Sequence, residues 1–582
     1  MWHKNRLLKG FFTGHRPLLW LTLLVSLASG LLTIAVPVAI GKYYDFLFGY
    51  RSFRAKLLDY LPFDLNDIRT FLVFFLLLVV LKTVFAFFEK YCTSVLGEKL
   101  VYQTRGLLFQ YQMKIPVRDY EDKGTGRYLL RFSGDLNSIK KYMTQGIVRF
   151  ASDMVLLLMA TALLFYLDPR LGLFMLLGLL LPLAGILAIK KKLSAATRKY
   201  RNLKSQLLAF TNTRLRGMQS VRLFNKEMPE LAKFSRRADR ILDAGIHYQK
   251  ITSLINALVP GMLYLLLAAL FAFIYFSGLN QSTATGSNIL VFIILVLTIM
   301  PVMRRLLRVN IVWELGNISF EKLMNVLNRA GATDKQLHPF VYKKGEILIK
   351  DASYGFRSQN DIFDKLNLHI PGHGLALVKG GTGSGKTTIV KLISKLYRPV
   401  SGRVYIDGQD LEKTDGRSLR RRITVVSAEV PLLGKTVFEA ISYSRKKEKR
   451  RAAQALLDYL QNNNPALPAL SLDSPIGDLG CNLSKGQRKL LAYARAMLTN
   501  KKIFLIDEPF EGFSKGAIPF WAGEIKKLAK HKTVLVFAAQ PVRKWLQPAH
   551  TFKLPEIKPA GGGLSSGTKK QGAVVLEGAA IA

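Results

Sequence analysis

The sequence predicts two different domains in one chain, an all-α transmembrane domain of six helices followed by an α/β domain with a phosphate-binding loop. Long apolar runs are confined to the part before Lys343, whereas short apolar strands, glycine turns and polar helices fill the part after it. In that second part a glycine-rich loop, Gly380–Thr387, stands between an apolar strand and a helix. With 582 residues the chain is also too long for one domain of about 100 to 200 residues.

Six apolar runs predict membrane-spanning helices, since about 20 residues are needed to cross about 30 Å of hydrocarbon. These runs are Leu18–Ile40, Phe71–Val95, Phe150–Leu167, Leu171–Ile189, Leu254–Phe276 and Ile289–Met303. Basic residues precede the first run, but the run is long and lacks the small-residue cleavage site of a signal peptide. We therefore expect it to be retained as a span.

The connections between the spans predict the orientation of the domain. Spans three and four are separated only by Asp168–Arg170, and spans five and six by the uncharged Ser277–Ser287, so these are expected to be outside hairpins. The connections after spans two and four are much longer, and the second is rich in Lys and Arg, which places both on the cytoplasmic side. Apolar residues at helical spacing in Leu203–Leu215 predict that the helices continue beyond the membrane.

The charge of the chain bears on its partners. Its 84 Lys and Arg outnumber 39 Asp and Glu, a net charge of +45 that in a soluble protein would indicate nucleic acid. Because much of the charge lies between apolar runs, as in Lys190–Lys204, we expect contact with anionic membrane lipid instead and no nucleic-acid partner. The two cysteines, Cys92 and Cys481, provide neither a disulfide framework nor a Cys-rich metal site.

Charged residues inside the spans allow two interpretations. Lys82 and Glu89 lie two turns apart on one face of the second span, where unpaired charge in lipid is costly. They predict either a polar lining for a solute path or an intramembrane ion pair with a snorkelling lysine. Arg304, Arg305 and Arg308, at the inner end of the sixth span, either contact an anionic solute or anchor the helix by the positive-inside rule.

The glycine-rich loop predicts a nucleotide phosphate site. Its glycines allow backbone N–H groups to surround phosphates at a helix N-terminus, while Lys386 supplies a cation and Thr387 a hydroxyl for Mg²⁺. The predicted ATP contacts in this loop are Gly380, Gly381, Thr382, Gly383, Ser384, Gly385, Lys386, Thr387 and Thr388.

A second strand, Lys502–Ile506, delivers two carboxylates to its carboxyl end. Ligands bind at such strand ends in open α/β sheets. We expect Asp507 to join Thr387 as a ligand of Mg²⁺, and Glu508 to be the catalytic group that activates the attacking water.

The segment Asn482–Arg488 carries a resemblance to a family. Leu483-Ser484-Lys485-Gly486-Gln487, shortly before Asp507 and Glu508, is similar to the Leu-Ser-Gly-Gly-Gln signature of ATP-binding-cassette (ABC) exporters, with Lys485 in place of the first glycine. The resemblance covers roughly Leu18–Leu554. It implies that two half-transporters form one transporter, and that Ser484, Gly486 and Gln487 complete the ATP site of the facing subunit.

The resemblance also implies further roles. Phe356, or less favourably Tyr354, occupies the position where the family stacks an aromatic ring on adenine. The less favoured alternative is that both rings only pack a strand. Thr125–Arg131 with Asp135, and Arg216–Asn225, resemble the two segments that couple the membrane domain to the ATPase domain.

Three departures from the family predict weakened hydrolysis. Ala428 stands where the family presents a Gln to the attacking water, and Ala539 where it presents a His to the γ-phosphate. Phe510–Ser514 replaces a loop that normally carries an Asp. Each loss of an aimed polar group costs about 10²-fold in rate. We therefore expect ATP binding without brisk hydrolysis, beside a non-identical partner, with a slow homodimer as the alternative.

The expected function is ATP-driven export of a lipid, peptide or drug-like solute by half of a dimeric ABC transporter in the plasma (inner) membrane, with the ATPase domain cytoplasmic. The alternative is an ATP-binding regulatory subunit with little hydrolysis of its own, and the fused domain order disfavours an importer. The predicted boundaries are 1–327 for the transmembrane domain, 328–344 for a linker, 345–556 for the nucleotide-binding domain and 557–582 for a disordered tail.

Overall fold

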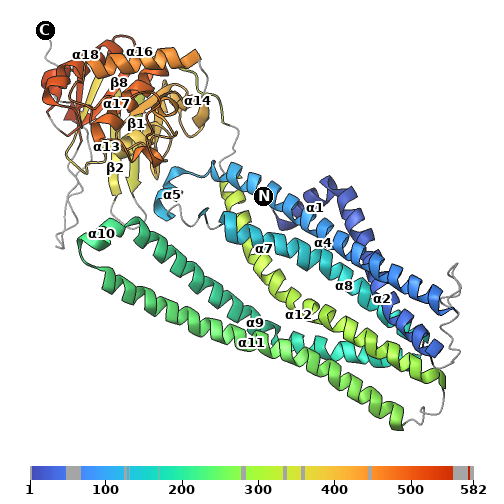
Figure 1. The fold of residues 1–582 in the computed structure, drawn as a ribbon. Helices are drawn as coiled ribbons and strands as arrows, with labels where there is room; N and C mark the ends of the chain where they lie inside the picture. Colours follow the sequence, from blue (N-terminus) through green and yellow to red (C-terminus); the bar gives the residue numbers. More distant parts are fainter. Residues whose placement is uncertain are drawn as a thin grey trace. The chain divides into compact units, whose positions relative to one another are not determined.

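The computed structural model of the chain contains two compact units (Figure 1). The structure describes residues 3–47, 67–123, 128–129, 131–167, 169–276, 283–331, 337–355, 361–443, 448–539, 541–554 and 575–576. The first unit comprises Met1–Ile115 and Asp119–Thr333, and the second comprises Pro116–Arg118 and Asp334–Ala582. The first unit is helical, and the second holds all the strands of the described residues.

Each of the six predicted spans lies within a long helix of the first unit. The six helices are α2 (Arg16–Leu47), α4 (Ile68–Gln112), α8 (Arg149–Leu167), α9 (Pro169–Arg216), α11 (Glu227–Phe276) and α12 (Thr283–Gly331). Shorter elements join or precede them, namely α1 (Lys4–Gly14), α5 (Val117–Lys123), η1 (Arg131–Asp135), α7 (Leu136–Lys141), η2 (Tyr142–Val148) and α10 (Met218–Leu223). The predicted all-α domain is confirmed.

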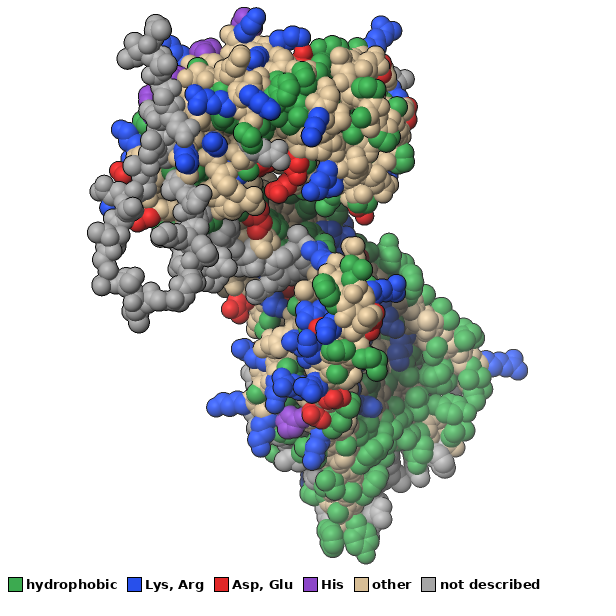
Figure 2. All heavy atoms as spheres, turned by 90° about the vertical axis from the view of Figure 1, so that its left-hand side faces the viewer, with side chains coloured by type: hydrophobic (Ala, Val, Ile, Leu, Met, Phe, Trp, Pro, Cys, Tyr) green, Lys and Arg blue, Asp and Glu red, His purple; other side chains and the backbone are tan. Residues whose placement is uncertain are grey.

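Five helices of the described residues are long and apolar enough to cross a membrane: Arg16–Tyr44, Ile68–Gln112, Leu136–Tyr166, Glu227–Phe273 and Leu290–Asn328. The fourth predicted span lies in α9, where the side chains of residues 178–188 are outside the described part. Large apolar side chains of α4 point outward, Val73 being 68 % and Leu76 66 % exposed. Figure 2 shows a broad apolar surface of this kind, as expected for helices in lipid.

The helices continue beyond the predicted apolar spans, as expected. Helix α9 continues from the fourth span to Arg216, and α11 begins at Glu227, well before the fifth span. Figure 1 shows α9 and α11 side by side as a hairpin closed by α10. The rings of Tyr200 and Tyr248 stack between them, with centroids 5.8 Å apart. We call α9, α10 and α11 together the long hairpin.

Charged side chains of the first unit form hydrogen bonds from one helix to another. The Glu89 carboxylate accepts a hydrogen bond of 2.7 Å from Ser29 Oγ, so it faces α2. The Arg305 guanidinium donates two hydrogen bonds, of 3.0 and 2.6 Å, to the carboxylate of Asp153 on α8. Arg308 donates to Asn256 Oδ1 at 2.8 Å. These polar groups join helices to one another.

The second unit is built on two sheets. One has the order β2-β1-β4-β5 and is antiparallel, with β1 (Ile347–Gly355), β2 (Asp361–Ile370), β4 (Ser401–Ile406) and β5 (Gln409–Asp410). The other has the order β10-β9-β3-β8-β7-β6, with β3 (Gly374–Lys379), β6 (Ile423–Val426), β7 (Ile503–Asp507), β8 (Thr533–Ala538), β9 (His550–Lys553) and β10 (Val575–Leu576). Strands β9, β3, β8, β7 and β6 are mutually parallel. The predicted α/β class is confirmed.

Helices and a core on each face cover the parallel strands. The helices of the unit are α13 (Lys386–Ile393), α14 (Gly416–Arg420), α15 (Val437–Ser442), α16 (Glu448–Asn462), α17 (Lys485–Leu498), α18 (Ile518–Ala529) and α19 (Arg543–Leu546), with single turns η4 (Asp478–Gly480) and η5 (Lys515–Ala517). Alternate residues of β7 enter different cores, Phe504 and Ile506 one, Ile503 and Leu505 the other. This two-sided burial explains why the strand sequences are almost wholly apolar.

The ends of the second unit differ in part from the predictions. Helix α12 continues into the segment predicted as a linker, and the Asp407 carboxylate accepts hydrogen bonds from the backbone N–H groups of Lys343, Lys344, Gly345 and Glu346. Val575–Leu576, predicted as part of a disordered tail, pairs as β10 with the edge strand β9. An unpaired edge attracts a further strand, and the isolated sequence of a short tail does not reveal this.

Candidate functional site

The order of the parallel strands brings the predicted site residues to one edge of a sheet. Strands β3, β8, β7 and β6 are neighbours and run in the same direction. The segments that follow them therefore meet at their carboxyl ends. These segments carry the phosphate loop after β3, Ala539 after β8, Asp507 and Glu508 at the end of β7, and Ala428 after β6.

The phosphate loop has the backbone that an anion cradle requires. Gly383 and Gly385 have φ angles of +85° and +86°, and Gly385 caps the N-terminus of α13. The Ser384 hydroxyl is buried and has no hydrogen-bond partner among the described residues. The Lys386 ammonium donates to the carbonyl oxygens of Gly380 and Gly381 at 2.9 and 2.8 Å. A helix N-terminus, an unsatisfied hydroxyl and a buried cation fit a bound phosphate group.

Gly385→Ala is expected to destabilise the second unit. The added Cβ would lie 2.2 Å from Phe363 Cζ, and a side chain at this positive φ costs about 1–2 kcal/mol in addition. Thermal unfolding of the nucleotide-free protein measures the loss. Gly381→Ala is the matched control, since its Cβ meets nothing within 4 Å. Equal melting temperatures for the two variants would contradict the strained geometry of the loop.

Thr387 and Asp507 form the oxygen pair predicted to hold Mg²⁺. Thr387 Oγ1 donates to Asp507 Oδ2 at 2.9 Å, across two elements far apart in sequence. Burial raises the pKa of the Asp507 carboxyl above its ordinary value, while the Thr387 hydrogen bond opposes that shift. A hydroxyl and a carboxylate are the hard oxygen ligands that Mg²⁺ takes in proteins, so these residues fit the metal.

Glu508 is held in a strained conformation beside the phosphate loop. Its φ angle of +46° is uncommon for a residue other than glycine. Its Oε1 accepts a hydrogen bond of 3.0 Å from the backbone N–H of Ala539 and lies 3.5 Å from Lys386 Nζ. Strain of this kind persists where the surroundings impose it, and it is frequent at functional sites.

Lys489 is a site component that the sequence reasoning missed. Its side chain is completely buried under the site, and its ammonium donates to the backbone carbonyl of Asp507. Burial lowers the pKa of Lys489 from its ordinary value to about 8, although Asp507, Glu511 and Glu508 raise it in part. The signal that could have found it is a lysine at the start of the largely apolar helical stretch Lys489–Met497, in which Arg495 is the other charged residue.

The Lys489 pKa predicts a pH dependence of stability. Between about pH 8 and pH 10.5 the unfolded chain holds a proton at Lys489 that the folded chain has released, so stability rises with pH in this range. A shift of this size corresponds to on the order of 3 kcal/mol. Unfolding measured at several pH values should show the rise in the parent protein and lose it in Lys489→Gln. A rise of the same size in the variant would rule out Lys489 as its source.

The signature segment begins a helix by a capping box. Gln487 N donates to Ser484 Oγ at 3.1 Å, and Ser484 N donates to Gln487 Oε1 at 3.0 Å. The Gln487 amide also donates to Pro468 O at 3.2 Å. A Cβ at Gly486 would lie 2.4 Å from Gly512 O, so only glycine permits this approach. Gln487 thus has a structural role within the chain.

Among the other residues predicted by resemblance, Lys485 and Tyr354 lie in the described part of the chain. Lys485, which replaces the signature glycine, lies 3.5 Å from Glu511 in the segment after Glu508. Phe356 lies outside the described residues. The alternative, Tyr354, is fully buried and stacks on Tyr397 at 5.1 Å, so it packs the core. Its ring cannot face a nucleotide in this arrangement.

One segment of the connection between the second and third spans is grouped with the second unit. Pro116–Arg118 is grouped with that unit, and the Arg118 guanidinium donates to Gly355 O at 2.8 Å. It also lies 5.0 Å from the Tyr354 ring. The coupling segment proposed from the sequence, Thr125–Arg131, lies slightly later in the chain and partly outside the described residues. Arg118 thus packs within the second unit.

Comparisons with known proteins agree with this architecture. The family described as the ABC transporter transmembrane region matches residues 19–302, and the family described as ABC transporter matches residues 363–511. An ATP-dependent lipid A-core flippase of Thiobacillus denitrificans is 27% identical over 546 residues, which cover 92% of this chain and 91% of the relative. One of Pectobacterium atrosepticum is 25% identical over 472 residues, covering 79% of this chain and 80% of the relative.

A solved structure shares the fold of the whole chain. A bacterial Atm1-family ABC exporter with ATP bound superimposes with a TM-score of 0.79 at 20% sequence identity. The match covers 93% of this chain and 94% of the exporter. The two domain types therefore follow one another along this chain in the same order as in that exporter.

Proposed function

The chain belongs to the ABC transporter family as an exporter-type half-transporter, and from this premise we propose that it drives export of a lipid across a membrane at the expense of ATP. The observation that carries the proposal is the convergence of the phosphate loop, Asp507 and Glu508 at one sheet edge, in a chain that also contains a unit of six long helices. Export of lipid in particular is supported by relatives named lipid A-core flippases.

The phosphates of ATP bind in the loop Gly380–Thr388 in this proposal. The backbone N–H groups at the start of α13 and the buried Ser384 hydroxyl donate to phosphate oxygens, and Lys386 exchanges its two carbonyl partners for the β- and γ-phosphates. Thr387 and Asp507 hold Mg²⁺, which neutralises phosphate charge when bound. Gly381, Thr382 and Gly383 are exposed and open to the nucleotide.

Glu508 orients and deprotonates the attacking water in the proposed hydrolysis. Its carboxylate is fixed by the Ala539 N–H and by the proximity of Lys386. A second oxygen of the carboxylate remains for the water. Ala428 and Ala539 offer no side-chain hydrogen bond to this water or to the γ-phosphate. The site built on Lys386 therefore hydrolyses its bound ATP more slowly than a complete site does.

Two half-transporters combine in the family, and we propose that this chain pairs with a non-identical one. Its own signature residues Ser484, Gly486 and Gln487 then serve the complete ATP site of the partner. The chain lies in the plasma (inner) membrane with its ATPase domain in the cytoplasm, in agreement with the basic composition of the long connections. The proposed domains are 1–327 and 345–556, with 328–344 between them.

Ala428 and Ala539 also favour a second candidate function. A chain that binds ATP and hydrolyses little of it acts as a regulatory subunit, since ATP binding alone biases two conformations of a transporter. Under this alternative the partner chain carries the catalytic site. The two candidates differ in whether hydrolysis at the site of Lys386 is needed for transport.

Reconstitution of the chain alone in lipid vesicles tests these proposals. ATP turnover should be slow, and it should fall further in Glu508→Gln while ATP binding persists. A brisk rate abolished by Glu508→Gln would contradict the heterodimer. Transfer of a labelled lipid between leaflets, measured with and without a candidate partner, then separates an exporter half from a regulatory subunit: transport that is unaffected by Glu508→Gln in the complex favours regulation.

A further inference from the structure

A groove on the long hairpin of the first unit is lined by cations, and it shares no residue with the candidate ATP site of the second unit. Its volume is about 320 Å³ and its lining is Leu203, Gln206 and Leu207 from α9 with Lys233, Arg236, Arg237 and Arg240 from α11. Figure 2, which views the hairpin from its α10 end, shows many Lys and Arg side chains on it. A 320 Å³ space is within the size range of small-molecule sites.

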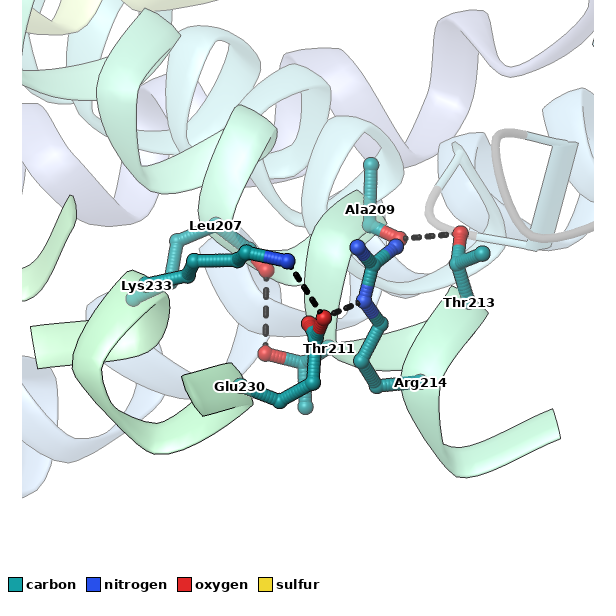
Figure 3. Close-up of polar contacts among 7 residues, drawn as sticks. All are labelled: Leu207, Ala209, Thr211, Thr213, Arg214, Glu230 and Lys233. Carbon is teal, nitrogen blue, oxygen red and sulfur yellow. Dashed lines mark hydrogen bonds and ion pairs between the residues drawn. The ribbon is translucent and has the colours of Figure 1, made fainter. Parts of the chain in front are cut away.

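Part of the charge at the mouth of the groove is compensated. Glu230 accepts from Arg214 Nε at 2.6 Å and from Lys233 Nζ at 2.7 Å, as Figure 3 shows. The hydrogen bond from Arg214 and then that from Lys233 hold the pKa of Glu230 below its ordinary value. The ring of Phe210 lies between two guanidinium groups, 4.3 Å from Arg214 and 4.4 Å from Arg237. These contacts fix the side chains around the groove and leave its space open.

The remaining cations have no such compensation. Arg236 and Arg240 lie one helical turn apart on α11, and neither forms an ion pair with an acidic residue of the described part of the chain. A neighbouring cavity of about 450 Å³ shares Leu203 and Arg240 and adds Lys199, His247 and the one carboxylate of its lining, Asp243. The arginines point from one helix toward a groove whose other side contains leucines. Their like charges repel one another unless an anion lies between them.

The place of the groove on α11 bears on the source of its ligand. The fifth span is predicted to begin at Leu254, so Arg240 precedes its apolar run by fourteen residues, or about 21 Å of helix. The headgroup layer of a bilayer adds only about 6 Å to the hydrocarbon on each side. The groove is therefore too far from the bilayer for an ordinary lipid headgroup to reach it while its chains stay in the membrane.

We propose that the groove between α9 and α11 binds a soluble anion bearing two or more phosphate groups. Guanidinium groups pair with phosphate oxygens through parallel hydrogen bonds, and Arg236, Arg237 and Arg240 supply three of them on neighbouring turns. Gln206 adds an amide donor from the facing helix. The bound anion cross-links α9 to α11 and stiffens the long hairpin. This site is independent of the ATP site and of the transported solute.

Calorimetric titration with sodium tripolyphosphate tests the site in the full chain. The protein is reconstituted in nanodiscs of zwitterionic lipid and carries Lys386→Ala, so that the phosphate loop does not contribute. We expect saturable binding that the double variant Arg236→Gln/Arg240→Gln weakens at least about tenfold. The matched control is Lys191→Gln/Lys192→Gln, which removes two exposed cations of α9 near the membrane and outside the groove. The control should bind as the parent does.

Two results would overturn the proposal. Absence of saturable binding to the parent is one, and equal weakening in the two double variants is the other, because equal weakening reflects net charge alone. Melting temperatures of both doubles confirm that each is folded. Nanodiscs with phosphatidylglycerol distinguish the source: if this lipid displaces tripolyphosphate from the parent and the Lys191/Lys192 control alike, the phosphate comes from a headgroup and the soluble source is wrong.

Discussion

Replacing Lys386 by alanine is expected to abolish ATP binding to the second unit. The Lys386 side chain is 7% exposed and is the cation held inside the phosphate loop. Its ammonium already contacts the Gly380 and Gly381 carbonyls, so it is positioned before any ligand arrives. Removal leaves triphosphate charge without its buried counter-charge, which typically costs about 2–5 kcal/mol, or roughly 30- to 5,000-fold in affinity.

A fluorescent ATP analogue titrated into the purified chain measures this loss. Lys391→Ala is the matched control, because Lys391 lies in the last turn of the same helix and its ammonium contacts Tyr397. That control should retain the affinity of the parent. Unchanged binding in Lys386→Ala would show that the phosphate loop is not the nucleotide site.

Restoring the two missing polar groups is expected to accelerate hydrolysis by the chain alone. Ala428 follows β6 and Ala539 follows β8, and both of these strands flank β7, whose end carries Asp507 and Glu508. A Gln at 428 and a His at 539 would therefore enter the site from its two sides. One aimed polar group is worth about 10² in rate, so the double replacement Ala428→Gln/Ala539→His should raise ATP turnover by at least that factor.

This prediction is tested by a double-mutant cycle. It compares the steady-state ATP turnover of the parent, the two single variants and the double variant. Adding Glu508→Gln to the double variant should return turnover to the background, which identifies the gain with this site. Turnover that stays at the parent level in a folded, ATP-binding double variant would mean that the alanines are not what limits hydrolysis. The Ala539 backbone N–H, which holds Glu508, is kept in every variant.

The sequence predicted those features whose causes are local. Apolar length alone predicts the six long helices, and the strand, loop and helix around Gly380–Thr387 are determined by neighbouring residues. The Thr387 and Asp507 pair followed from a general rule about strand ends, and the structure joins them by one hydrogen bond. The roles of these residues toward ATP and Mg²⁺ stay predictions.

Contacts between distant parts of the chain could not be predicted from the sequence. Arg305 pairs with Asp153 across two helices, and both sequence interpretations of the arginine cluster assumed that its charge was free. The side chain of Gln487, expected as a nucleotide contact, accepts a hydrogen bond from Ser484 N and donates one to Pro468 O. Such pairings depend on how helices pack, and no local pattern records which face of a helix meets which neighbour.

The first turns of α17 touch the loop after Glu508 and the end of β7 at once, through Gly486 against Gly512 and through Lys489 against the Asp507 carbonyl. The helix is buried and tightly packed at both contacts. We therefore expect a displacement of Ser484, at the start of this helix, to shift Asp507 as well. The residues predicted to serve a partner's ATP site and those predicted to hold this chain's own Mg²⁺ are thus joined through one buried helix.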